Sequence, residues 1–210
     1  ITNNGDIQNN LTNASNNHGV NLTGIKGVVS NFGTITNTLR AKNYGDIYNR
    51  TSTGTINNSG DIWNYSPGTF INSNSVINTS NVKNYSVLTN QDSGTLVTNG
   101  TFINYTSGVI TNNDSCTIEV KNTGSSTNYS TINNVYGGVI NIKNSAVFTN
   151  DSSGIVNSYG SINTQFGTTL RNYSKLNLKK NGSGTERGEL NCNGLLINEK
   201  NQDSGVITND

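Results

Sequence analysis

The sequence is short of almost everything that fills an ordinary globular core. Of its 210 residues, 30% are apolar and 12% are charged, against roughly 45–50% and about 25% in typical soluble domains. Such a chain cannot fill one thick hydrophobic core. It can fill a thin one in which every coil contributes a few inward side chains and the backbone bonds to its neighbours.

Charge of either sign is also scarce, and this scarcity excludes two kinds of partner. The formal net charge is +1, so we expect neither nucleic acid nor an anionic membrane, since both require a basic face. No run of about 18 apolar residues occurs, so no membrane insertion is expected. The near-neutral charge and the single proline, Pro67, also argue against disorder, whose usual signature is high net charge with many prolines.

Methionine is absent even from position 1, and histidine occurs once, as His18. An intact translation product begins with Met, so we interpret Ile1 as a processed N-terminus and expect a secreted protein, outside the cell or on its surface. The twelve acidic residues are scattered. We therefore expect no catalytic triad, no cofactor and no metal site, and we predict that the protein is not an enzyme.

Asparagine, by contrast, accounts for 42 of the 210 residues, and it recurs with a period. The pair Asn-Tyr returns at 64–65, 84–85 and 104–105, a spacing of 20 residues held twice. Between these pairs lie short apolar runs bounded by Gly, Ser, Asn or Thr. A fixed period of about 20 to 50 residues is typical of solenoids.

We therefore predict an all-β fold: a right-handed parallel β-solenoid with about three short strands per coil, roughly 20–22 residues per coil and about ten coils. One domain is expected over residues 1–210, with a weak first coil at 1–20, regular coils at 21–171 and less regular terminal coils at 172–210. No segment of ten or more residues has the 3.6-residue period of a helix.

The repeated asparagines are predicted to form a structural ladder, because the amide of one Asn can bond to the amide of the Asn one coil away. The tyrosines that follow them are expected to stack in a column that covers a corner. The first and last asparagines of the predicted series are Asn21 and Asn193. The ladder and column residues are Asn43, Asn64, Asn84, Asn104, Asn128, Asn150 and Asn172, with Tyr44, Tyr65, Tyr85, Tyr105, Tyr129 and Tyr173.

Two sequence patterns, Gly-x-Ile-x-Asn and Asn-x-Gly-x-Ile, recur across most of residues 21–171. They resemble the parallel β-helix repeats of filamentous-haemagglutinin-like exoproteins and of Asn/Thr-rich, adhesin-like surface proteins of bacteria and archaea. The resemblance implies a surface adhesin, sheath or fibre protein. It transfers no functional residue, because the matching positions are those that build the coil.

Two further sets of residues carry hypotheses. Cys116 and Cys192 lie between three and four coils apart, on the order of 15–19 Å along the axis, too far for a disulfide with each other. They are either free apolar side chains or intermolecular disulfide candidates. N-glycosylation is permitted by Asn-x-Ser/Thr triplets, among them those at Asn10, Asn49, Asn64, Asn84, Asn104 and Asn172.

Three functions remain open. The first is a secreted structural protein that assembles with copies of itself, through its ends and faces, into an extracellular fibre, sheath or surface layer. The second is an adhesin or binding module whose lateral face recognises a glycan or host surface, with Trp63, Tyr65, Tyr85 and Tyr105 as its contact strip. The third is a polysaccharide lyase or hydrolase, which would need a carboxylate pair that the sequence does not bring together.

Overall fold

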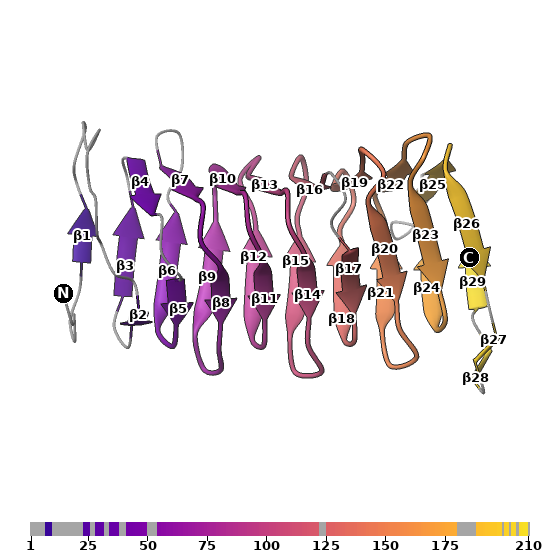
Figure 1. Ribbon diagram of the computed structural model, residues 1–210, viewed down its shortest axis with the longest axis horizontal. Helices are drawn as coiled ribbons and strands as arrows, with labels where there is room; N and C mark the ends of the chain where they lie inside the picture. Colours follow the sequence, from indigo (N-terminus) through magenta and orange to yellow (C-terminus); the bar gives the residue numbers. More distant parts are fainter. Residues whose placement is uncertain are drawn as a thin grey trace.

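The computed structural model describes residues 7–9, 23–25, 28–31, 34–37, 41–49, 54–121, 125–179, 188–198, 200–201, 203–204 and 206–209. Every element in this part of the chain is a β-strand. The strands stack side by side along one long axis, with β1 at one end and β29 at the other (Figure 1). The predicted all-β parallel solenoid is confirmed, and the described residues contain no helix.

Three parallel sheets form the sides of the solenoid. Sheet A contains β1 (Ile7–Asn9), β3 (Val28–Asn31), β6 (Asp46–Asn49), β9 (Thr69–Asn72), β12 (Val87–Asn90), β15 (Val109–Asn112), β18 (Thr131–Asn134), β21 (Ile155–Ser158), β24 (Lys175–Leu178) and β29 (Val206–Asn209). Sheet B contains β2 (Thr23–Ile25), β5 (Ala41–Asn43), β8 (Ile62–Asn64), β11 (Val82–Asn84), β14 (Phe102–Asn104), β17 (Ser125–Asn128), β20 (Val147–Asn150), β23 (Thr169–Asn172) and β26 (Leu195–Asn198). Sheet C contains β4 (Thr34–Asn37), β7 (Thr55–Asn58), β10 (Ser75–Asn78), β13 (Thr95–Thr98), β16 (Thr117–Val120), β19 (Val139–Ile142), β22 (Ser161–Thr164) and β25 (Glu189–Cys192).

The number of turns is smaller than the sequence predicts. The described residues make about seven turns of about 22 residues, so the prediction of about ten coils is wrong for this part of the chain. The three sheets differ in length, because sheet A has ten strands while sheet C has eight. Between β26 and β29 a short antiparallel pair, β27 (Lys200–Asn201) and β28 (Asp203–Ser204), interrupts the regular coil.

The strands are in register from turn to turn, so that like side chains stack on like. In sheet C, for example, Val76 pairs with Ile56 on one side and Leu96 on the other. Most strands alternate outward and buried positions, with the second and fourth residues inside. Each turn thus supplies about three inward apolar side chains, one per sheet. They form one continuous column that runs through the described turns.

Left-handed backbone at the corners is supplied mostly by Asp, Ser and Asn, not by glycine. In the Gln-Asp-Ser-Gly turn, Asp92 and Ser93 have φ of 53° and 66°. Asn144 and Ser145 adopt the same conformation at another corner, with φ of 55° and 64°. Short polar side chains tolerate this region because they bond to nearby backbone.

A glycine precedes many of the strands. At such a position glycine usually supplies a backbone conformation that other residues avoid, but here it is needed for lack of space. Gly94 does not have a positive φ, but a Cβ atom there would lie 2.5 Å from Oδ1 of Asn90 and 2.7 Å from the carbonyl oxygen of Asn72. Glycine is therefore required for close approach to the neighbouring turn and to the asparagine that lies inside it.

Candidate interaction surfaces

An asparagine ladder runs along the corner at the end of sheet B. Nδ2 of each Asn donates to Oδ1 of the Asn one turn further on; the distance is 2.8 Å from Asn43 to Asn64 and 2.9 Å from Asn64 to Asn84. The series continues through Asn104, Asn128, Asn150 and Asn172. Its last step joins Asn172 to Asn198 at 2.9 Å. The predicted end of the series, Asn193, is wrong, because Asn193 follows a strand of sheet C. Asn21 lies outside the described residues.

A second ladder, which the sequence analysis missed, runs along the end of sheet A. Its amide-to-amide distances are 2.8 or 2.9 Å, and its last asparagine donates to Oγ of Ser158 at 3.1 Å. An asparagine closes every strand of sheet A from β3 to β18, and that spacing was the available signal. The members of this ladder are Asn31, Asn49, Asn72, Asn90, Asn112 and Asn134.

Apart from Asn198, the asparagines of both ladders are buried, and their amides are saturated with hydrogen bonds. Asn84, for example, is 0% exposed. Its Nδ2 donates to Asn104 at 3.0 Å and to the backbone oxygen of Ser86 at 2.7 Å, and its Oδ1 accepts from Asn64. An amide with both donors and its acceptor used in this way fixes the distance between turns.

This burial overturns most of the glycosylation hypothesis. The predicted acceptors Asn49, Asn64, Asn84, Asn104 and Asn172 are at most 1% exposed. Their amide nitrogens are inside the solenoid and bonded to the next turn, so a glycan cannot be attached to them in the folded protein. Asn10 lies outside the described residues.

A tyrosine column covers the corner beside the sheet B ladder. Ring centroids are 4.9 Å apart between Tyr44 and Tyr65, 4.9 Å between Tyr65 and Tyr85, and 4.1 Å between Tyr85 and Tyr105, with nearly parallel planes. Tyr129 continues the stack at 6.2 Å.

The column is interrupted after Tyr129. The next residue at this corner is Asp151, whose amide donates to the preceding turn as the tyrosine amides do. Tyr173 occupies the same corner one turn later, but Asp151 separates it from the stack. Within the described residues, the contiguous column therefore consists of five rings.

Tyr85 is the middle ring of this column. Burial raises its pKa well above the ordinary value, and the hydrogen bond to Tyr105 and the charges of Tyr105 and Tyr65 raise it further. The hydroxyl therefore stays protonated through the physiological range.

Trp63 lies beside the tyrosine column, on the outer face of sheet B, and we call the column together with Trp63 the aromatic strip. Its ring packs edge-on against Tyr65, with centroids 6.0 Å apart. Nζ of Lys42 and Nζ of Lys83 lie 5.4 and 4.7 Å from its centroid, at distances typical of cation–π contacts. These lysines come from β5 and β11, which flank the strand of Trp63, so both faces of the ring are covered.

Two acidic side chains, Glu119 and Asp61, are bound to neighbouring side chains of the solenoid. Glu119, on sheet C, is 8% exposed, and its two carboxylate oxygens each lie 2.5 Å from a lysine, Lys121 and Lys143. Asp61 accepts hydrogen bonds from Ser80 and Asn81 in the next turn. In the described part of the chain, no group of three or more His, Cys, Asp or Glu side chains has the arrangement of a metal site.

The two cysteines do not bond to each other, and only one of them is accessible. Both are free; Cys116 is 0% exposed, whereas Cys192 is half-buried in β25. Burial raises the pKa of the Cys116 thiol. Cys116 takes the place before a strand that glycine holds in the neighbouring turns, so its thiol points inward. It cannot reach another molecule in the folded state, and the intermolecular hypothesis survives for Cys192 alone.

The final turn differs from the others because its apolar side chains are partly uncovered. Leu196 lies over Leu170 at an inward position but is 37% exposed, and Leu195, at an outward position, is 57% exposed. Leu190 and Ile207, from the other two sheets, also pack on the core and are only partly buried. The open edges of β25, β26 and β29 lie in this turn.

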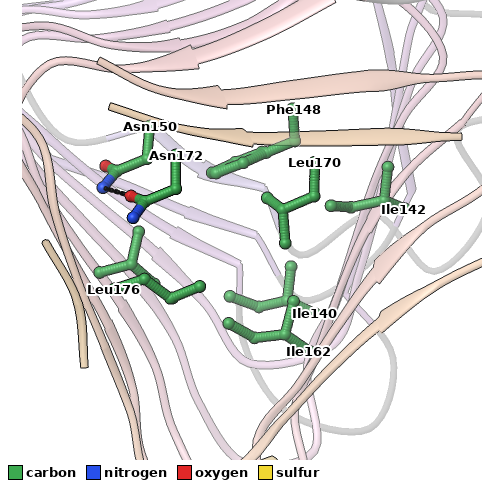
Figure 2. A pocket seen from close by; sticks show the side chains of 9 residues that line it. Ile140, Ile142, Phe148, Asn150, Ile162, Leu170, Asn172 and Leu176 are labelled. Atoms are coloured by element: carbon green, nitrogen blue, oxygen red, sulfur yellow. Dashed lines mark hydrogen bonds between the residues drawn. The ribbon is translucent and has the colours of Figure 1, made fainter. Parts of the chain in front are cut away.

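One gap in the apolar interior, between sheets A, B and C, is too small for a ligand. Ile140, Ile162, Phe148, Leu170 and Leu176 point toward one another beside the Asn150–Asn172 hydrogen bond (Figure 2). The cavity between them has a volume of about 10 Å³, about the space of one water molecule. The described residues also include no helix long and apolar enough to cross a bilayer.

Comparisons with protein-family models, with curated proteins and with solved structures find no match to this chain. The geometry of its surfaces therefore carries the functional argument.

Proposed function

We propose that this protein is a structural building block, a solenoid that associates end to end with copies of itself into an extracellular fibre, sheath or surface layer. The observation that carries the proposal is the last turn that the structure describes, where Leu190 and Ile207 pack on the core while only partly buried and Leu196, paired with Leu170, is 37% exposed. The edges of three strands end in this turn. The layer that covers them is, in this proposal, the N-terminal turn of a second copy, because only a head-to-tail contact propagates into a fibre.

The chemistry of the repeat favours such a continuation. Each added turn of the solenoid gains parallel backbone ladders in three sheets, amide bonds in two asparagine ladders and one more layer of the apolar column. An uncovered parallel edge with matching spacing is a template for another chain. A turn at the N-terminal end of a second copy would present the same strand spacing of about 4.8 Å and would continue the ladders and the apolar column across the junction.

Secretion and a right-handed coil belong to the same proposal. Handedness is supported by topology, because crossover connections between parallel strands of one sheet are overwhelmingly right-handed. Extracellular location is supported by the Asn- and Thr-rich repeat, which resembles those of bacterial and archaeal surface proteins.

Sedimentation velocity over a range of concentrations tests end-to-end association. We expect the wild-type chain to form a series of species that extends beyond two copies as the concentration rises, and Leu196→Glu not to form this series, because the charge would be buried at the junction. Leu195→Glu is the matched control: it carries the same charge on the same strand at an outward position, and it should associate like the wild type. Equal association of Leu196→Glu, or a single wild-type species at every concentration, would refute the proposal.

The adhesin alternative is less well supported by the aromatic strip. A sugar ring stacks on an open aromatic face. Tyr65 and Tyr85 each have a tyrosine on both sides, and Trp63 lies between two lysines. A glycan array on which the wild type binds selectively and Tyr85→Ala does not would favour the alternative.

A further inference from the structure

The outer face of sheet A has an arrangement of charge that the other two faces do not share. Because the second and fourth residues of its strands are buried, the first and third point outward. Over the five consecutive strands β9, β12, β15, β18 and β21, none of these outward residues is charged. We call them the neutral strip; its members are Thr69, Ile71, Val87, Thr89, Val109, Thr111, Thr131, Asn133, Ile155 and Asn157.

The neutral strip is bounded by one charge of each sign. Asp46 precedes it on β6 and Lys175 follows it on β24, and both occupy the first position of their strands. They therefore lie in one row along the rod with opposite signs at its two ends. Among the described residues neither side chain has an ion-pair partner.

The other faces have charge in their middle. Sheet C has Glu119, with Lys121 and Lys143 bound to it, at the strand nearest its centre. Sheet B presents Lys42 and Lys83 around Trp63. Desolvating either face against another sheet would bury charges, whereas the neutral strip buries Thr, Val, Ile and Asn.

We propose that the outer face of sheet A pairs with the same face of a second copy, with the two rods antiparallel. The twofold axis runs along β15, which is the central strand of the seven from β6 to β24. A rotation about the strand direction keeps each outward row opposite itself and reverses the order of the turns. Asp46 of each copy then faces Lys175 of the other.

The parallel alternative lacks this complementarity. A twofold axis along the rod would place β6 against β6 and β24 against β24 and would exchange the two outward rows. Asp46 would then face the row of Tyr48, and Lys175 the row of Asn177, so that neither charge meets an opposite one. In the antiparallel pair the Val109 side chains of the two copies meet at the axis, as β-branched side chains do in a dry interface between sheets.

The size of the face predicts how tight the pairing is. Six strand spacings from β6 to β24 give a length of about 29 Å, and four residues give a width of about 13 Å. The contact thus buries roughly 750 Å² over both copies, below the approximately 1,200 Å² of standard stable interfaces. A single pair is therefore weak, and pairing becomes strong where many copies are joined in line and present repeated faces.

This lateral pairing builds on the proposed end-to-end assembly, since both have the same partner, but it is tested separately. The measurement is sedimentation equilibrium at high protein concentration in the wild type and in Leu196→Glu, whose ends are blocked. We expect a monomer–dimer equilibrium in Leu196→Glu, and further association in the wild type. A dimer in the former with no further association in the latter would refute end-to-end assembly and leave the lateral pair intact.

Charge reversal identifies the antiparallel geometry. In the Leu196→Glu background we expect Asp46→Lys and Lys175→Asp, each alone, to weaken dimerisation about tenfold through like-charge contacts. The double reversal Asp46→Lys/Lys175→Asp should restore the original dissociation constant. Val109→Lys should abolish the dimer, and Ile77→Lys, at an exposed position on sheet C, should leave it unchanged.

Circular dichroism and thermal unfolding of every variant establish that it is folded. The proposal is overturned if the ends-blocked chain stays monomeric at millimolar concentration, if the single reversals have no effect, or if the double reversal fails to restore the dimer.

Discussion

At the residue scale, the protein replaces apolar bulk with buried amides. An Asn side chain inside a solenoid contributes little hydrophobic free energy, but it donates to the next turn and to a backbone carbonyl at once. Repeated in two corners, this bonding supplies the order that a chain with 30% apolar residues could not obtain from its core alone.

The first prediction concerns one ladder amide. Asn84→Ala removes the acceptor of Asn64 and the donor to Asn104, and so leaves buried polar groups without their partners. We expect a loss of about 1–3 kcal/mol in the free energy of unfolding, measured by denaturant titration. Asn57→Ala, at an outward position of β7, is the control and should change stability by no more than about 0.5 kcal/mol. Equal losses in both variants would show that the ladder adds no stability.

The second prediction concerns alkaline pH. The pKa of Tyr85 is raised in the folded state, chiefly by burial, whereas tyrosine in the unfolded chain ionises near pH 10. Its contribution to stability is therefore complete below about pH 10 and declines as the pH rises from there toward the folded pKa. Tyr85→Phe should reduce this alkaline loss in denaturant titrations. An identical pH dependence in the wild type and in Tyr85→Phe would contradict the assignment.

At the scale of the element, the features that recur with the Asn-Tyr period could be predicted from the sequence, and the features outside that period could not. The period of the Asn-Tyr pairs was enough to predict parallel strands, the sheet B ladder and the stacked rings, because equivalent residues must lie one above another. The second ladder escaped, because its asparagines are followed by no common residue. The end of the first ladder moved from Asn193 to Asn198, because the sequence between β24 and β25 is longer than that between β21 and β22, so the period of the Asn-Tyr pairs no longer applies.

The burial of the site residues could not be predicted from spacing alone. An Asn-x-Ser/Thr triplet looks the same whether its Asn faces solvent or the interior, and a cysteine in a turn looks exposed. Asn64 and Cys116 are both buried because the corner residues of this solenoid point inward, where the ladder needs them.

The third prediction separates two uses of glycine. Gly94 has no positive φ but no room for a Cβ atom. Gly167 has a φ of +82°, and a Cβ atom added there would lie 3.6 Å from its nearest neighbour, Oγ of Ser145. Gly94→Asn should therefore lower the free energy of unfolding by about 1–3 kcal/mol or more through overpacking. Gly167→Asn should be nearly neutral, because Asn accepts the left-handed region. Denaturant titration measures both, and the reverse order would contradict this account of the turns.

At the scale of the molecule, the solenoid is a straight stack whose ends and faces differ. The ten strands of sheet A span about 43 Å at the usual spacing. The aromatic strip is closed by its own stacking, the sheet C face carries ion pairs, the sheet A face is neutral between two opposite charges, and the last turn is partly uncovered. A molecule with this distribution is suited to contact copies of itself.

The measurement that tests this account most directly is electron microscopy of the purified chain at increasing concentration. We predict rods whose lengths exceed the roughly 45 Å of one copy and grow with concentration. Leu196→Glu should yield rods of one-copy length under the same conditions. Uniform single rods in the wild type at every concentration would contradict the central claim that the solenoid continues from one copy into the next.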